Sequence, residues 1–382
     1  MSAPALTLRG AQVLWPDEIG PGALSLADGV ITDTPQERVV DLAGFLILPG
    51  LVDAHGDAFE RHLAPRRGAM MDLARGLIAT EAELAASGIT TATLAQFYSW
   101  EGGLRGPEFA ARMLEALAAT RPRVATDLRA QLRVEVSLID AYADIEEMIA
   151  QSGVDYVVFN DHLPHVALAA GKRPPRLTGQ SLRIGRNPET HLGIMQALHA
   201  RMPEVPPALD TLAARLAAAG VRLGSHDDQT ADSRARHRAR GVRIAEFPET
   251  PEAAEAARTG GDAVIMGAPN VMRGGSHNGN AGALEMIAAG CVDALASDYH
   301  YPSLAGAAFR LVDAAVCDLA SAWRLVSTGP AHALGLDDRG ALRPGLRADL
   351  TVIDPDARRV VATLAGGQIS YMTGAAAARF IG

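Results

Sequence analysis

A histidine and an aspartate stand two residues apart at the end of an apolar segment, in the sequence LPGLVDAHGD. The segment 45–52 is typical of a buried strand, and the dipeptide Pro49-Gly50 interrupts it. Residues i and i+2 of a strand point to the same side, so His55 and Asp57 could bind one divalent cation together. Taken alone, the pair is explained more simply by a histidine and an aspartate that hydrogen-bond each other in a loop.

Four more candidate ligands stand where other apolar segments end. Glu135 lies in LRVEVSLID, His162 follows YVVFND, His226 ends VRLGSH, and Asp298 ends VDALASD. Each one alone has a simpler explanation, such as a helix cap or a hydrogen bond to the backbone. Six such residues at five segment ends instead predict a metal centre. Histidine and carboxylate ligands without cysteine suit one or two divalent cations, zinc first, with manganese, iron and nickel as alternatives.

Two of the carboxylates are predicted to be catalytic. Glu135 lies inside an apolar segment, where a buried carboxylate needs a partner, and it could bridge two cations. Asp298 could both touch a cation and accept a proton from the attacking water, as a general base does. Which carboxylate forms the bridge is left open by the sequence.

Polar residues near these positions are candidate substrate-binding groups. The segment GAPNVMRGGSHNGN, residues 267–280, precedes a helical pattern, and its backbone N–H groups could cradle a phosphate. The alternative is a turn-rich loop without a ligand. In AEFPET, capping or solvated roles are favoured over metal binding for Glu246 and Glu249. The candidate substrate-binding residues are Arg61, Asp227, Asp228, Arg273, Ser276, His277, Asn278 and Asn280.

Eight apolar segments, separated by Ala- and Leu-rich helical patterns, are expected to position these residues. An alternation of this kind predicts a (β/α)8 barrel, whose chemistry lies at the carboxyl ends of its strands. The alternative is an open, doubly wound sheet. The predicted strands are Gly50–His55, Ile89–Phe97, Ala130–Ser137, Val154–Asn160, Val221–His226, Val242–Phe247, Asp262–Gly267 and Val292–Ser297.

Both ends of the chain are rich in short strand patterns and turns. They predict one small, β-sandwich-like domain formed by residues 1–48 and 341–382, with the barrel at 49–340. Two independent hairpins are the alternative. The segment 161–220 is too long for a simple crossover and predicts a helical insertion, either a lid over the active face or a surface excursion without function.

Composition narrows the classes of partner. The chain has 382 residues and a net charge of −9, which argues against nucleic acid and anionic membranes but not against a small anionic substrate. Two cysteines give no disulfide framework or zinc motif. An apolar stretch of about 18 residues is absent, as is a signal-like start, so we expect a cytoplasmic protein, possibly a homo-oligomer.

Several motifs together resemble the amidohydrolase superfamily over nearly the whole chain. The start LPGLVDAHGD resembles its first metal motif, and GALRPGLRADLTVID resembles the return to its small β domain. Most members carry His-x-His where this chain has His55-Gly56-Asp57. This departure, with GITT, LRVEV, SHDDQT, IAEFPET, GAPNVMRGGSHNGN and ASDY, is similar to the branch that acts in phosphonate breakdown.

The resemblance implies a (β/α)8 barrel and a metal-dependent diphosphatase. The expected reaction is hydrolysis of alpha-D-ribose 1-methylphosphonate 5-triphosphate to the 5-phosphate and diphosphate. One alternative is an amide or cyclic-amide hydrolase or a deaminase of the same superfamily. A second is a metal-binding subunit of a phosphonate-degrading complex with no turnover of its own. Product identification distinguishes the three.

Overall fold

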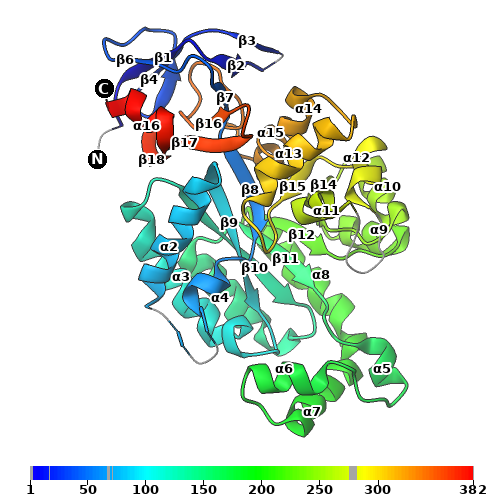
Figure 1. Ribbon diagram of the computed structural model, residues 1–382. Coiled ribbons are helices and arrows are strands. Elements are labelled where there is room, and N and C mark those ends of the chain that lie inside the picture. The colour runs from blue at the N-terminus through cyan, green and yellow to red at the C-terminus, as the bar shows by residue number, and fades with distance from the viewer. Residues whose placement is uncertain (1–2, 17, 67–68, 71, 275–281, 382) are drawn as a thin grey trace.

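The computed structural model of the protein describes residues 3–16, 18–66, 69–70, 72–274 and 282–381. Its centre is an eight-stranded sheet in which every pair of neighbouring strands is parallel and neighbours follow the order of the chain (Figure 1). The strands are β8 (Leu51–Gly56), β9 (Ile89–Tyr98), β10 (Asp127–Glu135), β11 (Tyr156–Asn160), β12 (Arg222–His226), β13 (Ile244–Glu246), β14 (Ala263–Gly267) and β15 (Ala294–Ala296). This arrangement confirms the predicted fold class and all eight predicted strands.

The first and last strands of this sheet meet and nearly close it into a barrel. The Asp298 N–H donates to the carbonyl oxygen of His55 at 2.9 Å, and the Asp57 N–H donates to that of Asp298 at 2.9 Å. The buried carboxylate of Asp53 accepts from both the backbone N–H and the hydroxyl of Ser297, at 2.9 and 2.5 Å. The carboxyl ends of all eight strands are therefore brought around one centre, because a closed sheet has no edges to separate them.

Helices surround the barrel because each parallel strand is connected to the next on the outside. No helix of the described residues combines the length and the apolar character needed to cross a membrane. The helices next to the strands are α1 (Glu60–Leu63), α2 (Leu73–Ala86), α3 (Pro107–Thr120), α4 (Tyr142–Ser152), α8 (Val205–Ala218), α9 (Ala231–Ala239), α10 (Pro251–Thr259), α11 (Ala268–Arg273), α12 (Ala283–Ala288), α13 (Ser303–Asp313), α14 (Leu319–Arg324) and α15 (Thr328–Ala333).

The two ends of the chain build two further sheets that share one hydrophobic core. In Figure 1 they lie together at the amino-terminal ends of the barrel strands, with the C-terminal helix α16 (Gly374–Ile381) beside them. One sheet contains β1 (Leu6–Arg9), β4 (Leu24–Ala27), β5 (Val30–Thr32) and β6 (Val39–Asp41). The other contains β2 (Gln12–Leu14), β3 (Ile19–Pro21), β7 (Leu46–Pro49), β16 (Leu350–Asp354), β17 (Arg359–Ala365) and β18 (Gln368–Met372).

The long connection after β11 is helical. Three of its helices, α5 (His165–Ala169), α6 (Leu177–Arg183) and α7 (Pro188–Ala200), project from the barrel as a separate lobe (Figure 1). They have a small hydrophobic core of their own that includes Met195 and the barrel-side residue Trp100. The fourth helix, α8, packs against the barrel instead.

Candidate metal centre

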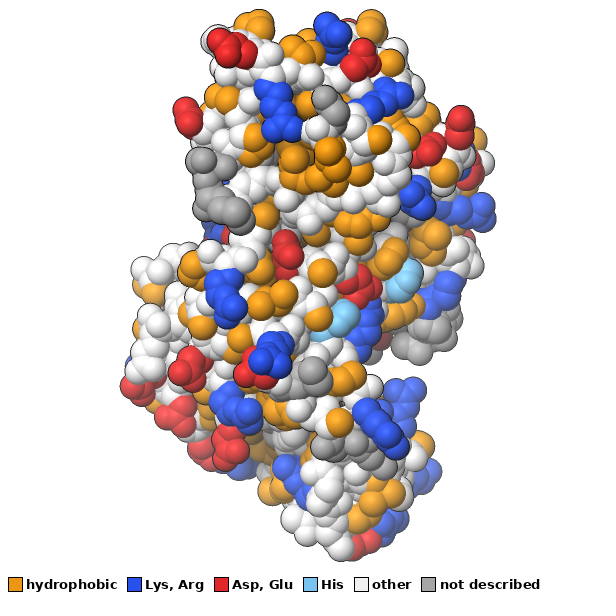
Figure 2. Space-filling model, turned by 60° about the vertical axis from the view of Figure 1, so that its left-hand side comes forward, with side chains coloured by type: hydrophobic (Ala, Val, Ile, Leu, Met, Phe, Trp, Pro, Cys, Tyr) orange, Lys and Arg blue, Asp and Glu red, His pale blue; other side chains and the backbone are white. Residues whose placement is uncertain are grey.

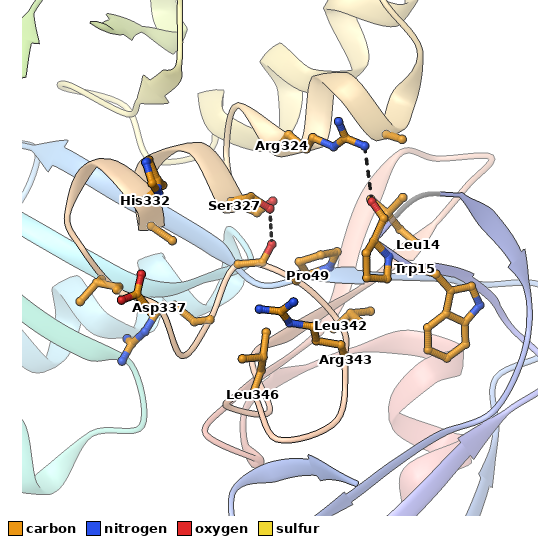
Figure 3. Close-up of a pocket in the computed structure, with 18 residues that line it drawn as sticks. Leu14, Trp15, Pro49, Arg324, Ser327, His332, Asp337, Leu342, Arg343 and Leu346 are labelled. Atoms are coloured by element: carbon orange, nitrogen blue, oxygen red, sulfur yellow. Dashed lines mark hydrogen bonds between the residues drawn. The ribbon is translucent and has the colours of Figure 1, made fainter. Parts of the chain in front are cut away.

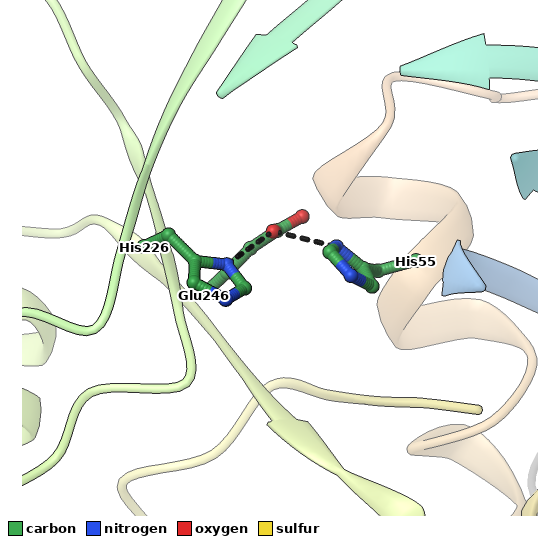
Figure 4. A group of neighbouring side chains, drawn as sticks. All are labelled: His55, His226 and Glu246. Atoms are coloured by element: carbon green, nitrogen blue, oxygen red, sulfur yellow. Dashed lines mark hydrogen bonds and ion pairs between the residues drawn. The ribbon is translucent and has the colours of Figure 1, made fainter. Parts of the chain in front are cut away.

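A buried carboxylate joins two imidazoles at the carboxyl ends of the strands. Glu246 ends β13, and its partner in register on β12 is His226, so both side chains lie at the same level of the barrel. One oxygen of Glu246, Oε2, is 2.8 Å from Nδ1 of His55 and 3.3 Å from Nδ1 of His226 (Figure 4). Glu246 is fully buried, so the expected capping or solvated role for this residue is wrong.

The other oxygen of Glu246 is held from a different side. Gln131 donates to Oε1 at 2.6 Å and the Tyr156 hydroxyl donates to it at 2.6 Å. These two residues are partners in register on β10 and β11. Burial alone would raise the pKa of Glu246, but the two imidazoles outweigh it and hold the pKa well below its usual range. The carboxylate is therefore charged, and each of its oxygens accepts two hydrogen bonds.

This arrangement decides which nitrogen of each imidazole faces the site. When Nδ1 donates its proton to Glu246, Nε2 carries a lone pair. Nε2 of His55 is buried and has no hydrogen-bond partner among the described residues. Nε2 of His226 is 2.8 Å from a guanidinium nitrogen of Arg133. An unsatisfied buried lone pair beside a carboxylate-held imidazole is what a divalent cation requires, so His55 fits a metal site, whereas the lone pair of His226 is held by Arg133 in this structure.

A second group of potential ligands lies alongside. Ligand atoms of Glu101, Glu135 and His162 all lie within 4.8 Å of one another. Glu135 is fully buried, accepts from Nδ1 of His162 through one oxygen, and accepts from the His162 backbone N–H at 3.1 Å through the other. The ring centroids of His162 and His226 are 6.4 Å apart, so the two groups belong to one end of the barrel.

A buried arginine stands between these groups. The guanidinium of Arg133 lies 3.9 Å from the ring centroid of Phe97 and also donates to Asn160 at 3.3 Å. A second guanidinium, that of Arg105, lies 4.1 Å from the same ring centroid. The site thus combines carboxylates and imidazoles with fixed positive charge, which favours an anionic substrate over a neutral one.

The two remaining predicted metal ligands are Asp57 and Asp298. They lie beside the two groups, but neither belongs to a group whose ligand atoms all lie within 4.8 Å of one another. Asp57 and Asp298 are tied to each other and to His55 by the backbone hydrogen bonds that close the barrel. Asp298 has a left-handed backbone, with a φ of 57°, which turns its side chain away from the line of the strand. Burial, and then the nearby charge of Asp57, raise the pKa of Asp298 to about 6.

The predicted substrate-binding residues do not share one environment, and each of those described has partners of its own. Arg61 donates to a carboxylate oxygen of Glu83 and to the Tyr299 carbonyl oxygen at 3.1 Å, so its charge is already paired. Asp227 has an oxygen 3.7 Å from Nε2 of His226 and therefore borders the site. Arg273 donates to the hydroxyl of Tyr299 at 2.5 Å.

Asp228 is committed to a buried network. It accepts from the Ser225 hydroxyl at 2.5 Å and from the guanidinium of Arg234 at 2.9 Å, and it lies 3.6 Å from His237. The remaining four predicted binding residues fall outside the described residues: Ser276, His277, Asn278 and Asn280.

Sequence reasoning missed the polar residues that precede Glu135 on β10. In the segment QLRVEV, polar Gln131, Arg133 and Glu135 alternate with apolar residues and therefore all point to the same face of the strand. That alternation was a usable signal. Glu101 and Tyr156 gave no comparable signal, because neither lies in a pattern that distinguishes it from a surface glutamate or a core tyrosine.

Two cavities adjoin the centre. One has a volume of about 970 Å³ and borders Glu101, and the other has a volume of about 940 Å³ and borders His162 and His226. A smaller cavity of about 310 Å³ lies at the opposite end of the barrel, beside Pro49 and the terminal sheets (Figure 3). None of the predicted site residues that the structure describes lines this third cavity.

Comparisons with known proteins identify the family through a family model and a relative, and solved structures share the fold. The model of the Amidohydrolase family matches residues 58–371. Alpha-D-ribose 1-methylphosphonate 5-triphosphate diphosphatase of Escherichia coli (strain K12) is 33% identical over 360 residues, covering 91% of this chain and 94% of that protein. Among solved structures, molinate hydrolase matches with a TM-score of 0.65 and 14% identity, covering 97% of this chain and 95% of that one. Beta-aspartyl dipeptidase from Fervidobacterium islandicum AW-1 matches with a TM-score of 0.58 and 14% identity, covering 96% and 97%.

Proposed function

This chain belongs to the amidohydrolase family, and we propose that it hydrolyses alpha-D-ribose 1-methylphosphonate 5-triphosphate to the 5-phosphate and diphosphate. The family consists of metal-dependent hydrolases, and the E. coli relative that matches nearly the whole chain is named for this substrate. The observation in the structure that supports the proposal is the carboxylate-held pair of imidazoles beside the buried Arg133, because a triphosphate needs both a cation and fixed positive charge.

The residues that would hold the cation stand at or just after the carboxyl ends of the barrel strands. We assign this role to the six predicted ligands, His55, Asp57, Glu135, His162, His226 and Asp298, with Glu246 positioning two of the imidazoles. Zinc is the first candidate, and whether Glu135 bridges two cations belongs to this same proposal. A bound divalent cation supplies electrophilic stabilisation of phosphoryl oxygens and makes water a stronger acid.

The protein side chains carry the remaining steps. Water attacks a phosphorus of the triphosphate in line, its oxygen forms the new P–O bond, and the bridging P–O bond to the leaving diphosphate breaks. Asp298 takes the proton that the water loses, since its carboxylate is half-buried at the strand ends and its pKa is raised to about 6. Arg133 stabilises the negative charge that develops on the phosphoryl oxygens.

Product identification tests this function. The purified protein with its metal content measured is incubated with the ribose 5-triphosphate, and diphosphate is separated from orthophosphate by anion-exchange chromatography. We expect one diphosphate per 5-phosphate formed, and loss of the reaction after chelation and dialysis. Orthophosphate as the first product, or no reaction by the metal-loaded protein, contradicts the proposal. Release of ammonia or a carboxylate from amides would instead support the amide-hydrolase alternative.

Bound metal without turnover of any triphosphate would support the second alternative, a metal-binding subunit of a phosphonate-degrading complex that has no turnover of its own. The predicted cytoplasmic location and the possible homo-oligomer stay predictions. Cell fractionation tests the first and sedimentation of the purified protein tests the second.

A further inference from the structure

A positively charged cavity lies beside the candidate metal centre, between the barrel and the helical lobe. Its volume is about 970 Å³. Three carboxylates line it, those of Glu60, Glu101 and Glu108. Burial raises the pKa of Glu60 to about 7, which reduces its negative charge at neutral pH. The lining guanidinium groups are those of Arg66, Arg105, Arg112, Arg183 and Arg186.

The second cavity beside the metal centre, which borders His162 and His226, has the opposite balance of charge. With histidines counted as neutral, its three cations, Lys172, Arg173 and Arg236, face four carboxylates. One of these cations, Arg173, is already paired with Glu189 at 2.6 Å, and one of the carboxylates, Asp228, is paired with the buried Arg234 at 2.9 Å. Among the described lining residues, the first cavity has two more cations than carboxylates, and the second has one fewer. An anionic group that reaches the centre is therefore attracted more strongly to the first cavity than to the second.

Four guanidinium groups of the first cavity are available for an anion. Arg66, Arg112, Arg183 and Arg186 form no ion pair with a carboxylate among the described residues, whereas Arg105 is paired with Glu101. Arg186 is held in place through neutral partners, because it donates to the carbonyl oxygen of Trp100 at 3.1 Å and contacts Nδ1 of His191 at 2.9 Å. A planar guanidinium group with free N–H donors can bind two oxygens of one phosphate at the same time.

The first cavity adjoins the candidate metal centre. Glu101 lines it and also belongs to the ligand group of Glu135 and His162. Arg105 lines it and shares the ring of Phe97 with Arg133. One end of a molecule bound in this cavity would lie beside the candidate metal-binding residues. The rest of the molecule would extend toward the helical lobe.

We propose that this cavity binds the triphosphate arm of the substrate and retains the diphosphate that leaves. The assignment rests on the proposed function, because it takes the triphosphate as the substrate's charged end. It also gives the helical lobe a role, since Arg183 ends α6 and Arg186 follows in the turn before α7. Figure 2 shows Lys and Arg side chains on both sides of the recess that separates this lobe from the body of the molecule.

Binding of inorganic tripolyphosphate tests the cavity without any turnover. Isothermal titration calorimetry is performed on the metal-loaded protein, with metal content measured again after the titration. We expect Arg112→Gln and Arg183→Gln each to weaken binding by about tenfold, the effect of losing one charge-assisted contact of roughly 1.4 kcal/mol. Lys172→Gln, which removes a cation from the second cavity, is the matched control and keeps the wild-type affinity. Arg183→Lys restores part of the loss because it keeps the charge.

Wild-type affinity in both arginine variants, or a larger loss in Lys172→Gln, overturns the assignment. Thermal unfolding of each variant shows whether the fold is retained, and both arginines are on the surface of helices, where such changes are tolerated. The two proposals fail separately. Absence of diphosphate release by the wild-type protein rejects the function, whereas diphosphate release with unchanged tripolyphosphate binding in the arginine variants rejects only the cavity.

Discussion

Glu246 shows how one side chain can set the chemistry of two others. Its carboxylate accepts from Nδ1 of His55 and His226 through one oxygen and from Gln131 and Tyr156 through the other. Histidine ligands in metal sites depend on such a partner, because it fixes which nitrogen keeps its lone pair. A neutral residue of the same shape cannot accept four hydrogen bonds in this way.

Replacing this carboxylate should release the metal. Glu246→Gln puts an NH2 group where an oxygen now accepts two hydrogen bonds, so at least one donor loses its partner. We expect metal affinity to fall by about 10- to 100-fold, measured by elemental analysis after dialysis against a graded series of chelator concentrations. Glu249→Gln, three residues along and outside the ligand groups, is the control and keeps its metal. Equal metal retention in the two variants would exclude a positioning role for Glu246.

The proton acceptor is a second prediction at this scale. Asp298→Asn keeps the size of the side chain but cannot take a proton from water. We expect kcat for diphosphate release to fall by about 100-fold or more while KM changes little. Steady-state kinetics on the metal-loaded variant measures this, with the metal content as control. Near-normal kcat in a folded, metal-loaded Asp298→Asn protein would remove this residue from the proton step.

At the scale of elements, the helical lobe is fixed to the barrel by a tight turn after β9. Gly102 has a φ of 80°, and a methyl group added there would lie 2.8 Å from a guanidinium nitrogen of Arg186. Ile184 lies against the neighbouring Gly103 in the same way. The lobe is thus not a loose surface excursion, because it contacts the barrel through these glycines and through Trp100.

This contact can be tested with a pair of glycine substitutions. Gly102 has a φ of 80° and a ψ of −167°, a combination essentially limited to glycine, so Gly102→Ala adds this strain and a close contact with Arg186. Gly171→Ala, with a φ of 63° and nothing within 4 Å, adds only the strain of a positive φ. We expect Gly102→Ala to lower the free energy of unfolding by about 1 kcal/mol more than Gly171→Ala does. Urea unfolding followed by circular dichroism measures the difference. Equal losses would show that the turn needs neither the glycine backbone at residue 102 nor the close approach of Arg186.

Across the whole molecule, barrel closure depends on a buried pair between the first and last strands. Ser297→Ala removes the hydroxyl that donates to Asp53. One oxygen of this fully buried carboxylate then loses that hydrogen bond. We expect the free energy of unfolding to fall by about 1–3 kcal/mol. Ser152→Ala, which removes a hydroxyl bonded to Met148 within its own helix, is the control with a smaller loss. A smaller effect at Ser297 than at Ser152 would mean that this pair contributes little to closure.

The sequence by itself determined the eight strands, the strand-end positions of His55, Glu135, His226 and Asp298, and the family. These features are local, because an apolar segment of strand length and the polar residue that ends it are contiguous in the chain. Glu246 is different. It lies in a short strand of three residues followed by a phenylalanine and a proline, and nothing in that segment distinguishes it from a solvated glutamate.

Only the tertiary structure decided the environment of Glu246, because its four partners come from four other strands, β8, β10, β11 and β12. The same holds for the positive cavity, whose arginines lie on the barrel side and on the helical lobe, up to 120 residues apart. Burial and net local charge are sums over neighbours in space. The chain brings those neighbours together only when the barrel closes and the lobe packs against it.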